Sequence, residues 1–119
     1  MSATTPDPGV SVLRLGGEND ALDLPRLRSK LSTAVDGEEP VIVDLTGVTS
    51  IDAAIFRVLL EGLAECERRE RTFLLLLPEG DDSPVIRLFR IAGLDGLLPV
   101  VSSWGEAYAR AAAQADAPG

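Results

Sequence analysis

The amino-acid sequence predicts a single domain of the α/β class, and two observations carry this prediction. Strand-like runs alternate along the chain with runs in which apolar residues recur every three or four positions, as on one face of a helix. Two of the strand-like runs, 41–45 and 73–77, are almost wholly apolar, which is typical of central parallel strands covered by helices. At 119 residues the chain can build one hydrophobic core but not two domains.

The first half of the chain reads as strand, helix and strand. Residues 10–15 alternate apolar with polar or small side chains, as a half-buried strand does, and the glycine-rich segment after them is typical of a loop. Asp23 is a plausible N-cap for a helix that has Pro25 in its first turn. One face of that helix is apolar: Leu24, Leu27, Leu31 and Val35. Residues 41–45 are the next strand.

A second helix is predicted over residues 53–69, and residues 73–77 follow as a buried strand. The apolar stripe of this helix consists of Ile55, Leu59, Leu63 and Cys66, with Val58 and Gly62 beside it.

The last part of the chain is predicted to hold two more helices and a short strand. Ser83 and Pro84 are typical of a helix start, and this third helix should end before Gly93. Residues 97–101 read as a strand. Ser103 and Glu106 have the spacing of a capping box, which predicts a fourth helix. The domain therefore spans 9–112, with flexible tails at 1–8 and 113–119.

Composition excludes several classes of function. The net charge of −8 opposes binding to duplex nucleic acid or to an anionic membrane surface. The chain has no histidine and one cysteine, so it lacks the commonest general base and zinc ligand, and we expect neither catalysis nor a cofactor or metal. A receiver domain is rejected, because Asp44 lacks an acidic pair after the first strand and Lys30 lies in a helix rather than after a late strand. With no signal peptide and no run long enough to span a bilayer, we expect a cytoplasmic, bacterial protein.

Three segments indicate a particular family in addition to the fold class: "RLGGEND", "VIVDLTGVTSID" and "VIRLFRIAGLDGLLPVVSSWGEAYA". In this order they resemble the STAS domain family over about 105 residues. The resemblance implies a four- to five-stranded mixed sheet with about four helices, and 41–45 and 72–77 adjacent and parallel. STAS domains usually carry an extra N-terminal strand, and this chain has little sequence before Val10 to form one. Family members include bacterial anti-sigma-factor antagonists and the cytoplasmic ends of sulfate transporters.

The resemblance also points to a site. In the antagonists, Asp-Ser-Ser/Thr-Gly follows the strand, and an anti-sigma factor that is also a kinase phosphorylates one hydroxyl at the start of the helix. Asp52 matches the aspartate of this motif and Asp20 matches a loop aspartate, but the hydroxyl positions are Ala53 and Ala54, and the glycine is Ile55. An alanine methyl cannot accept a phosphoryl group, so the usual switch is absent.

We therefore expect a non-catalytic interaction module that acts in transcription regulation and binds a kinase-like anti-sigma factor or another STAS or regulatory protein. Its partner surface would consist of Asp20, Asp52, Ala53, Ala54, Ile55 and Phe56. Asp52 is a good helix cap whatever the function, and capping is favoured over a chemical role for it. Ile55 can be core instead of contact surface. Two alternatives remain open: a STAS subunit of a transport complex, and a small-ligand site at the ends of the strands.

Overall fold

The computed structural model describes residues 5–7, 10–19, 21–78, 83–91, 93 and 98–116. Their elements follow the predicted alternation of strand and helix. In chain order they are β1 (Thr5–Asp7), β2 (Val10–Asn19), the 3₁₀ turn η1 (Ala21–Asp23), α1 (Leu24–Asp36), β3 (Val41–Ile51), α2 (Ala53–Arg68), β4 (Phe73–Leu76), α3 (Pro84–Ile91), β5 (Val100–Val101) and α4 (Trp104–Asp116).

The strands form one sheet in the order β1-β2-β3-β4-β5. The predicted central pair is confirmed: β3 and β4 are adjacent and parallel, in register from Val41 opposite Phe73 to Asp44 opposite Leu76. The four strands β2 to β5 all run parallel. The expected mixed character is limited to the three-residue β1, which pairs antiparallel with the start of β2 at the edge.

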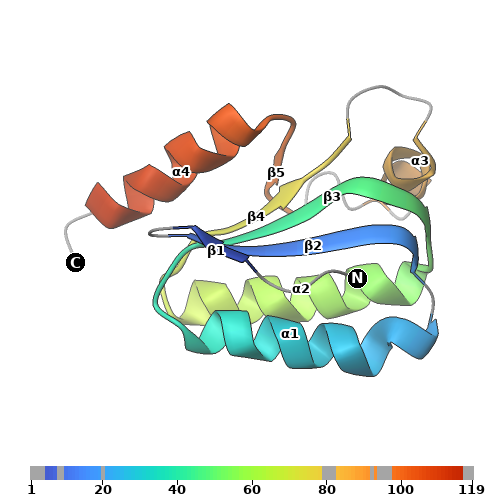
Figure 1. Cartoon of the computed structure of the whole chain (residues 1–119), viewed down its shortest axis with the longest axis horizontal. Helices are drawn as coiled ribbons and strands as arrows, with labels where there is room; N and C mark the ends of the chain where they lie inside the picture. The colour runs from blue at the N-terminus through green and yellow to red at the C-terminus, as the bar shows by residue number, and fades with distance from the viewer. Residues whose placement is uncertain are drawn as a thin grey trace.

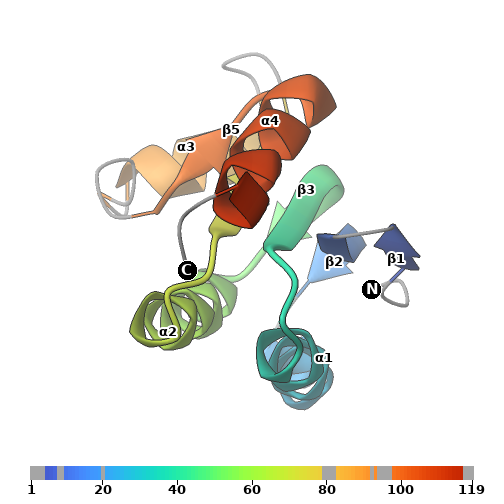
Figure 2. The same cartoon turned by 90° about the vertical axis from the view of Figure 1, so that its left-hand side faces the viewer.

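Helices cover both faces of this sheet, as the apolar central strands predict (Figure 1). Helices α1 and α2 lie side by side against one face, and α4 lies on the opposite side, over β4 and β5 (Figure 2). The larger core lies beneath α1 and α2, and the predicted stripe of α2 is buried in it: Ile55, Val58, Leu59, Gly62, Leu63 and Cys66. The smaller core combines β-strand residues with α4: Val10, Val12, Ile42, Leu74, Leu76, Val101, Ala107 and Ala111.

Several predicted boundaries are wrong. Strand β2 continues to Asn19 through the segment expected to be a loop, and β3 continues to Ile51, because the two strands stay paired along their length with two register shifts. Gly16 lies opposite Gly47 in this extension. The range 1–8, expected to be a tail, contains β1, and α4 continues to Asp116, while β5 has only two residues.

Three of the four predicted caps are confirmed. The Ser83 hydroxyl accepts from the Val85 N–H at 3.2 Å, the Ser103 hydroxyl accepts from the Glu106 N–H at 3.1 Å, and Asp52 caps α2. Asp23 makes no side-chain capping bond, since η1 runs directly into α1 and holds Asp23 in a helical conformation. Within the described residues, no helix is both long enough and apolar enough to cross a membrane.

Candidate functional site

The predicted site lies where β3 ends and α2 begins, at the end of the molecule where β2 also turns into α1 (Figure 1). Asp52 is the only residue between β3 and α2, and its backbone is extended, with φ −83° and ψ 143°. Its Oδ1 accepts from the Ala54 N–H at 2.9 Å, and its carbonyl accepts from the Ile55 N–H at 2.9 Å. The Asp52 side chain is therefore an N-cap, which satisfies one of the free amides of the first turn.

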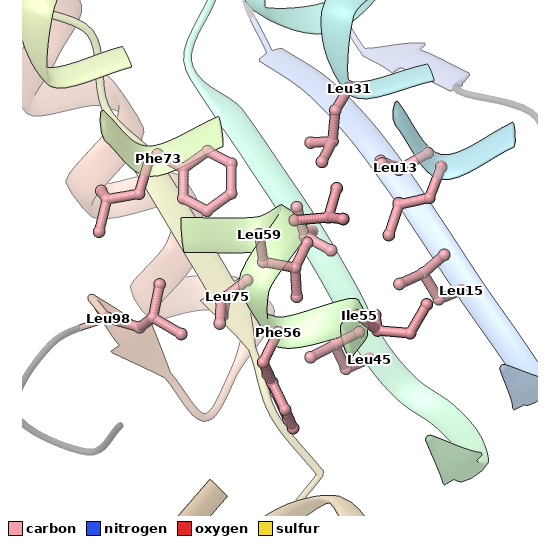
Figure 3. Packing of buried hydrophobic residues seen from close by; sticks show 14 of the residues in the cluster. Leu13, Leu15, Leu31, Leu45, Ile55, Phe56, Leu59, Phe73, Leu75 and Leu98 are labelled. Atoms are coloured by element: carbon pink, nitrogen blue, oxygen red, sulfur yellow. The ribbon is translucent and has the colours of Figure 1, made fainter. Parts of the chain in front are cut away.

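The first turn of α2 divides into a surface half and a core half. Ala53 is exposed and Ala54 is partly exposed, whereas Ile55 is 0% and Phe56 is 2% exposed. Figure 3 shows the Ile55 side chain beside Leu15 and Leu45 in the core.

Phe56 is held in the same core by an aromatic neighbour. Its ring meets that of Phe89 in α3 edge-to-face, with centroids 5.8 Å apart. Neither Ile55 nor Phe56 can contact a partner directly in this structure. The surface available to a partner is Asp52, Ala53 and Ala54, and Ile55 and Phe56 support it from beneath.

The turn before α1 adjoins this surface. Asn19 at the end of β2 lies opposite Ile51 at the end of β3, so η1 follows directly beside Asp52. Leu22 in η1 is 88% exposed. Asp20, the remaining predicted site residue, lies outside the described residues. The described residues of the predicted site thus lie together, and the exposed Leu22, which sequence reasoning did not single out, lies in the adjoining turn.

Asp44 is separate from this site and has a local structural role, as expected. It is 7% exposed, and its Oδ1 accepts from the Thr46 N–H at 2.9 Å and from the Thr46 hydroxyl at 2.6 Å. Its other oxygen lies 3.6 Å from Arg14 Nε, and the Arg14 guanidinium in turn lies over the ring of Trp104 in α4. Among the described residues, no group of carboxylates and thiols has an arrangement suited to a metal ion.

A hollow of about 180 Å³ lies between α1 and α2, and not at the ends of the strands. It is lined by Arg28, Leu31, Ser32, Val35, Val58, Glu61, Gly62 and Glu65. Arg28 and Glu61 form an ion pair across it. This position does not support the crevice that the small-ligand alternative requires at the ends of the strands.

Comparison with known proteins agrees with this geometry. The family model described as "Mlab, STAS domain" matches residues 2–99. The chain belongs to the STAS domain family. A search of the curated proteins found no match.

Solved structures share the STAS fold over nearly the whole chain. An anti-sigma factor antagonist from Mycobacterium paratuberculosis has a TM-score of 0.77 at 22% identity, covering 94% of this chain and 93% of that one. A sulfate transporter family protein from Wolinella succinogenes has a TM-score of 0.66 at 23% identity, covering 95% and 93%. The Bacillus cell fate determinant SpoIIAA in its phosphorylated form has a TM-score of 0.63 at 25% identity, covering 89% and 94%.

Proposed function

We propose that this STAS domain is a non-catalytic interaction module similar to an anti-sigma-factor antagonist, and that phosphorylation does not switch it at the usual site. Its partner would be an anti-sigma factor or another regulatory protein, and the contact surface would be Asp52, Ala53 and Ala54, together with Asp20. The observation that carries the proposal is the first turn of α2. Asp52 caps this turn and its surface half faces solvent, but the two residues of that half are alanines.

The chemistry of the site supports this proposal in two ways. A methyl group offers no oxygen to a kinase, so charge cannot be added at Ala53 or Ala54. The Asp52 carboxylate is already committed to the Ala54 amide. A capping carboxylate fixes the helix start, which is a structural role compatible with a binding surface and not a catalytic one.

The proposal is tested with the anti-sigma factors encoded in the genome that carries this chain, each produced recombinantly and titrated by calorimetry. We expect one of them to bind with an affinity that ATP does not change. Ala54→Ser should leave this affinity nearly unchanged. Ala54→Asp and Ala54→Glu should weaken it by more than ~1 kcal/mol, because a charge must be desolvated at the contact.

The acidic variants also decide where the partner binds. If Ala54→Asp binds as tightly as the wild type, the start of α2 is not the contact surface. If no anti-sigma factor binds, the antagonist-like function is wrong.

A second candidate is a STAS subunit of a transport complex. The likeness to the Wolinella sulfate transporter family protein favours it. Co-expression with the transporter subunits encoded beside this chain, followed by purification through a tag on the transporter, distinguishes the two. Retention of the STAS domain through purification supports the transport role.

A further inference from the structure

Helix α4 is attached to the sheet through small side chains. Of its side chains that the structure describes, 104–112, Ala107 and Ala111 are buried in the smaller core, and the partly exposed Trp104 packs against that core. Helix α2, in contrast, buries several large side chains in the larger core: Ile55, Phe56, Val58, Leu59 and Leu63. Because hydrophobic stabilisation grows with the apolar area removed from water, α4 is held much less strongly than α2.

A contact between Trp104 and Arg14 adds to this weak attachment. The Arg14 guanidinium of β2 lies over the Trp104 ring, 5.6 Å from its centroid, and Arg14 Nε lies 3.6 Å from the Asp44 carboxylate of β3. Tyr108 stacks on the same indole with centroids 5.7 Å apart. The stack of Trp104 and Tyr108 lies within α4, whereas the contact of Trp104 with Arg14 joins α4 to the sheet.

The connection to α4 lies at the edge of the sheet. Strand β5 has two residues, Val100 and Val101, and pairs with β4 alone. Two exposed serines, Ser102 and Ser103, lead from β5 into α4. The larger core, on the other face of the sheet, contains none of the α4 residues that the structure describes (Figure 2). Detachment of α4 therefore leaves the larger core and the start of α2 intact.

We propose that α4 detaches from the sheet as a unit while the rest of the domain stays folded, and that the contact of Trp104 with Arg14 limits how often it does so. The open form uncovers the smaller core, to which the strands contribute apolar side chains: Val10, Val12, Ile42, Leu74, Leu76 and Val101. This conformational change concerns a second face of the domain and does not depend on the proposed function. Once detached, a helix of 13 residues is only marginally stable in water, so its amides lose their protection from hydrogen exchange.

Native-state amide exchange of the wild-type domain, followed by NMR, tests the opening. The reporting amides are those of 107–112, of which the first donates to the Ser103 carbonyl at 3.0 Å. We expect them to share one opening constant and to exchange at least about 100-fold faster than the amides of 58–63 in α2. Opening of α4 exposes far less surface than global unfolding, so urea should accelerate the α4 amides only weakly, and the main urea transition still reports the whole domain.

A truncation in the larger core separates opening of α4 from global unfolding. Ile55 keeps its contacts when α4 detaches, so Ile55→Ala should accelerate exchange of the α2 amides at least about tenfold and change that of the α4 amides less than about twofold. Ile55→Val is less disruptive and should accelerate the α2 amides about two- to tenfold with the same selectivity. The second variant keeps the test valid if the first does not fold.

Matched removal of two arginines tests the contact with Trp104. Arg14→Ala should accelerate exchange of the α4 amides about two- to fivefold, the effect of losing an exposed cation–π contact. Arg28→Ala removes an arginine that is ion-paired with Glu61 on the other face of the sheet, and should leave the α4 amides unchanged.

Four results would overturn the inference. They are equal exchange rates for the α4 and α2 amides, protection in α4 that rises steadily from Ala112 back to Ala107 as in a fraying helix end, equal acceleration of both helices by Ile55→Ala, and equal effects of the two arginine variants on α4.

Discussion

Replacing Ile55 by alanine tests whether the proposed docking surface at the start of α2 is built on the hydrophobic core. Ile55 is 0% exposed and lies beside Leu15 and Leu45, so its truncation removes three buried carbons beneath the first turn of α2 (Figure 3). Such truncations cost about 2–5 kcal/mol, since they lose apolar burial and leave a cavity. A domain of this length has a free energy of unfolding of roughly 6–18 kcal/mol, so the loss is a large fraction of the total.

The assay is urea unfolding followed by the fluorescence of Trp104, the one tryptophan of the chain. With a urea dependence of about 2 kcal/mol per molar, a loss of ~3 kcal/mol lowers the midpoint by roughly 1.5 M. Ile91→Ala is the matched control: it makes the same chemical change at a side chain that is 82% exposed, and should alter the free energy of unfolding by less than about 0.5 kcal/mol. Equal effects of the two substitutions would refute the assignment of Ile55 to the core.

Three further predictions concern the far ends of α1 and α2. Glu70 has φ 57° in a Schellman turn that is closed by the hydrogen bond from the Arg71 N–H to the Cys66 carbonyl. Glu70→Gly should therefore raise the free energy of unfolding by about 1 kcal/mol and raise the thermal midpoint with it. A lowered midpoint would contradict this. Arg71 donates to the carbonyls of Ala34, Val35 and Glu39, so Arg71→Ala should cost about 2 kcal/mol in urea unfolding, against less than ~0.5 for the exposed Arg68→Ala. Burial raises the pKa of the Cys66 thiol more than Arg71 and Arg69 lower it. The contribution of the thiol to stability is therefore complete below its unfolded pKa and is lost as pH rises through the higher, folded pKa. Because the thiol is buried, a thiol reagent should label the native protein far more slowly than the unfolded one.

Much of the fold follows from local signals. The apolar stripe of α2, the buried runs in β3 and β4 and the caps at Asp52, Ser83 and Ser103 were all predictable, because hydrophobic period and capping chemistry lie within a few residues of sequence. These signals decide which residues face the core.

The extensions of β2 and β3 were not predictable in this way. Gly16 and Gly47 lie opposite each other in the sheet, yet glycines and polar residues in sequence are typical of loops. Pairing with a strand about 30 residues away outweighs that local preference. The same holds for β1, whose three residues include a proline and are ordered against Val10–Val12.

The local geometry of the candidate site was predictable only in part. Sequence spacing located Asp52 at the helix start, but left Ile55 undecided between core and contact, because only the packing of α2 on the sheet fixes which way it points. The pairing of charged side chains was also beyond sequence reasoning. Arg28 and Glu61 form a pair although they are 33 positions apart, and no local pattern indicates that pairing.

The two departures from the family motif act on different properties of the same surface. The alanines remove the chemical means of adding charge, which concerns regulation. Ile55 anchors the turn: full burial of such a side chain contributes about 1.5–3 kcal/mol that a glycine cannot supply. A turn fixed in this way has little freedom left to lose when a partner binds, so binding does not bear the cost of ordering it. Under the proposed function, we therefore expect the occupancy of this surface to follow the concentration of the protein and not kinase activity.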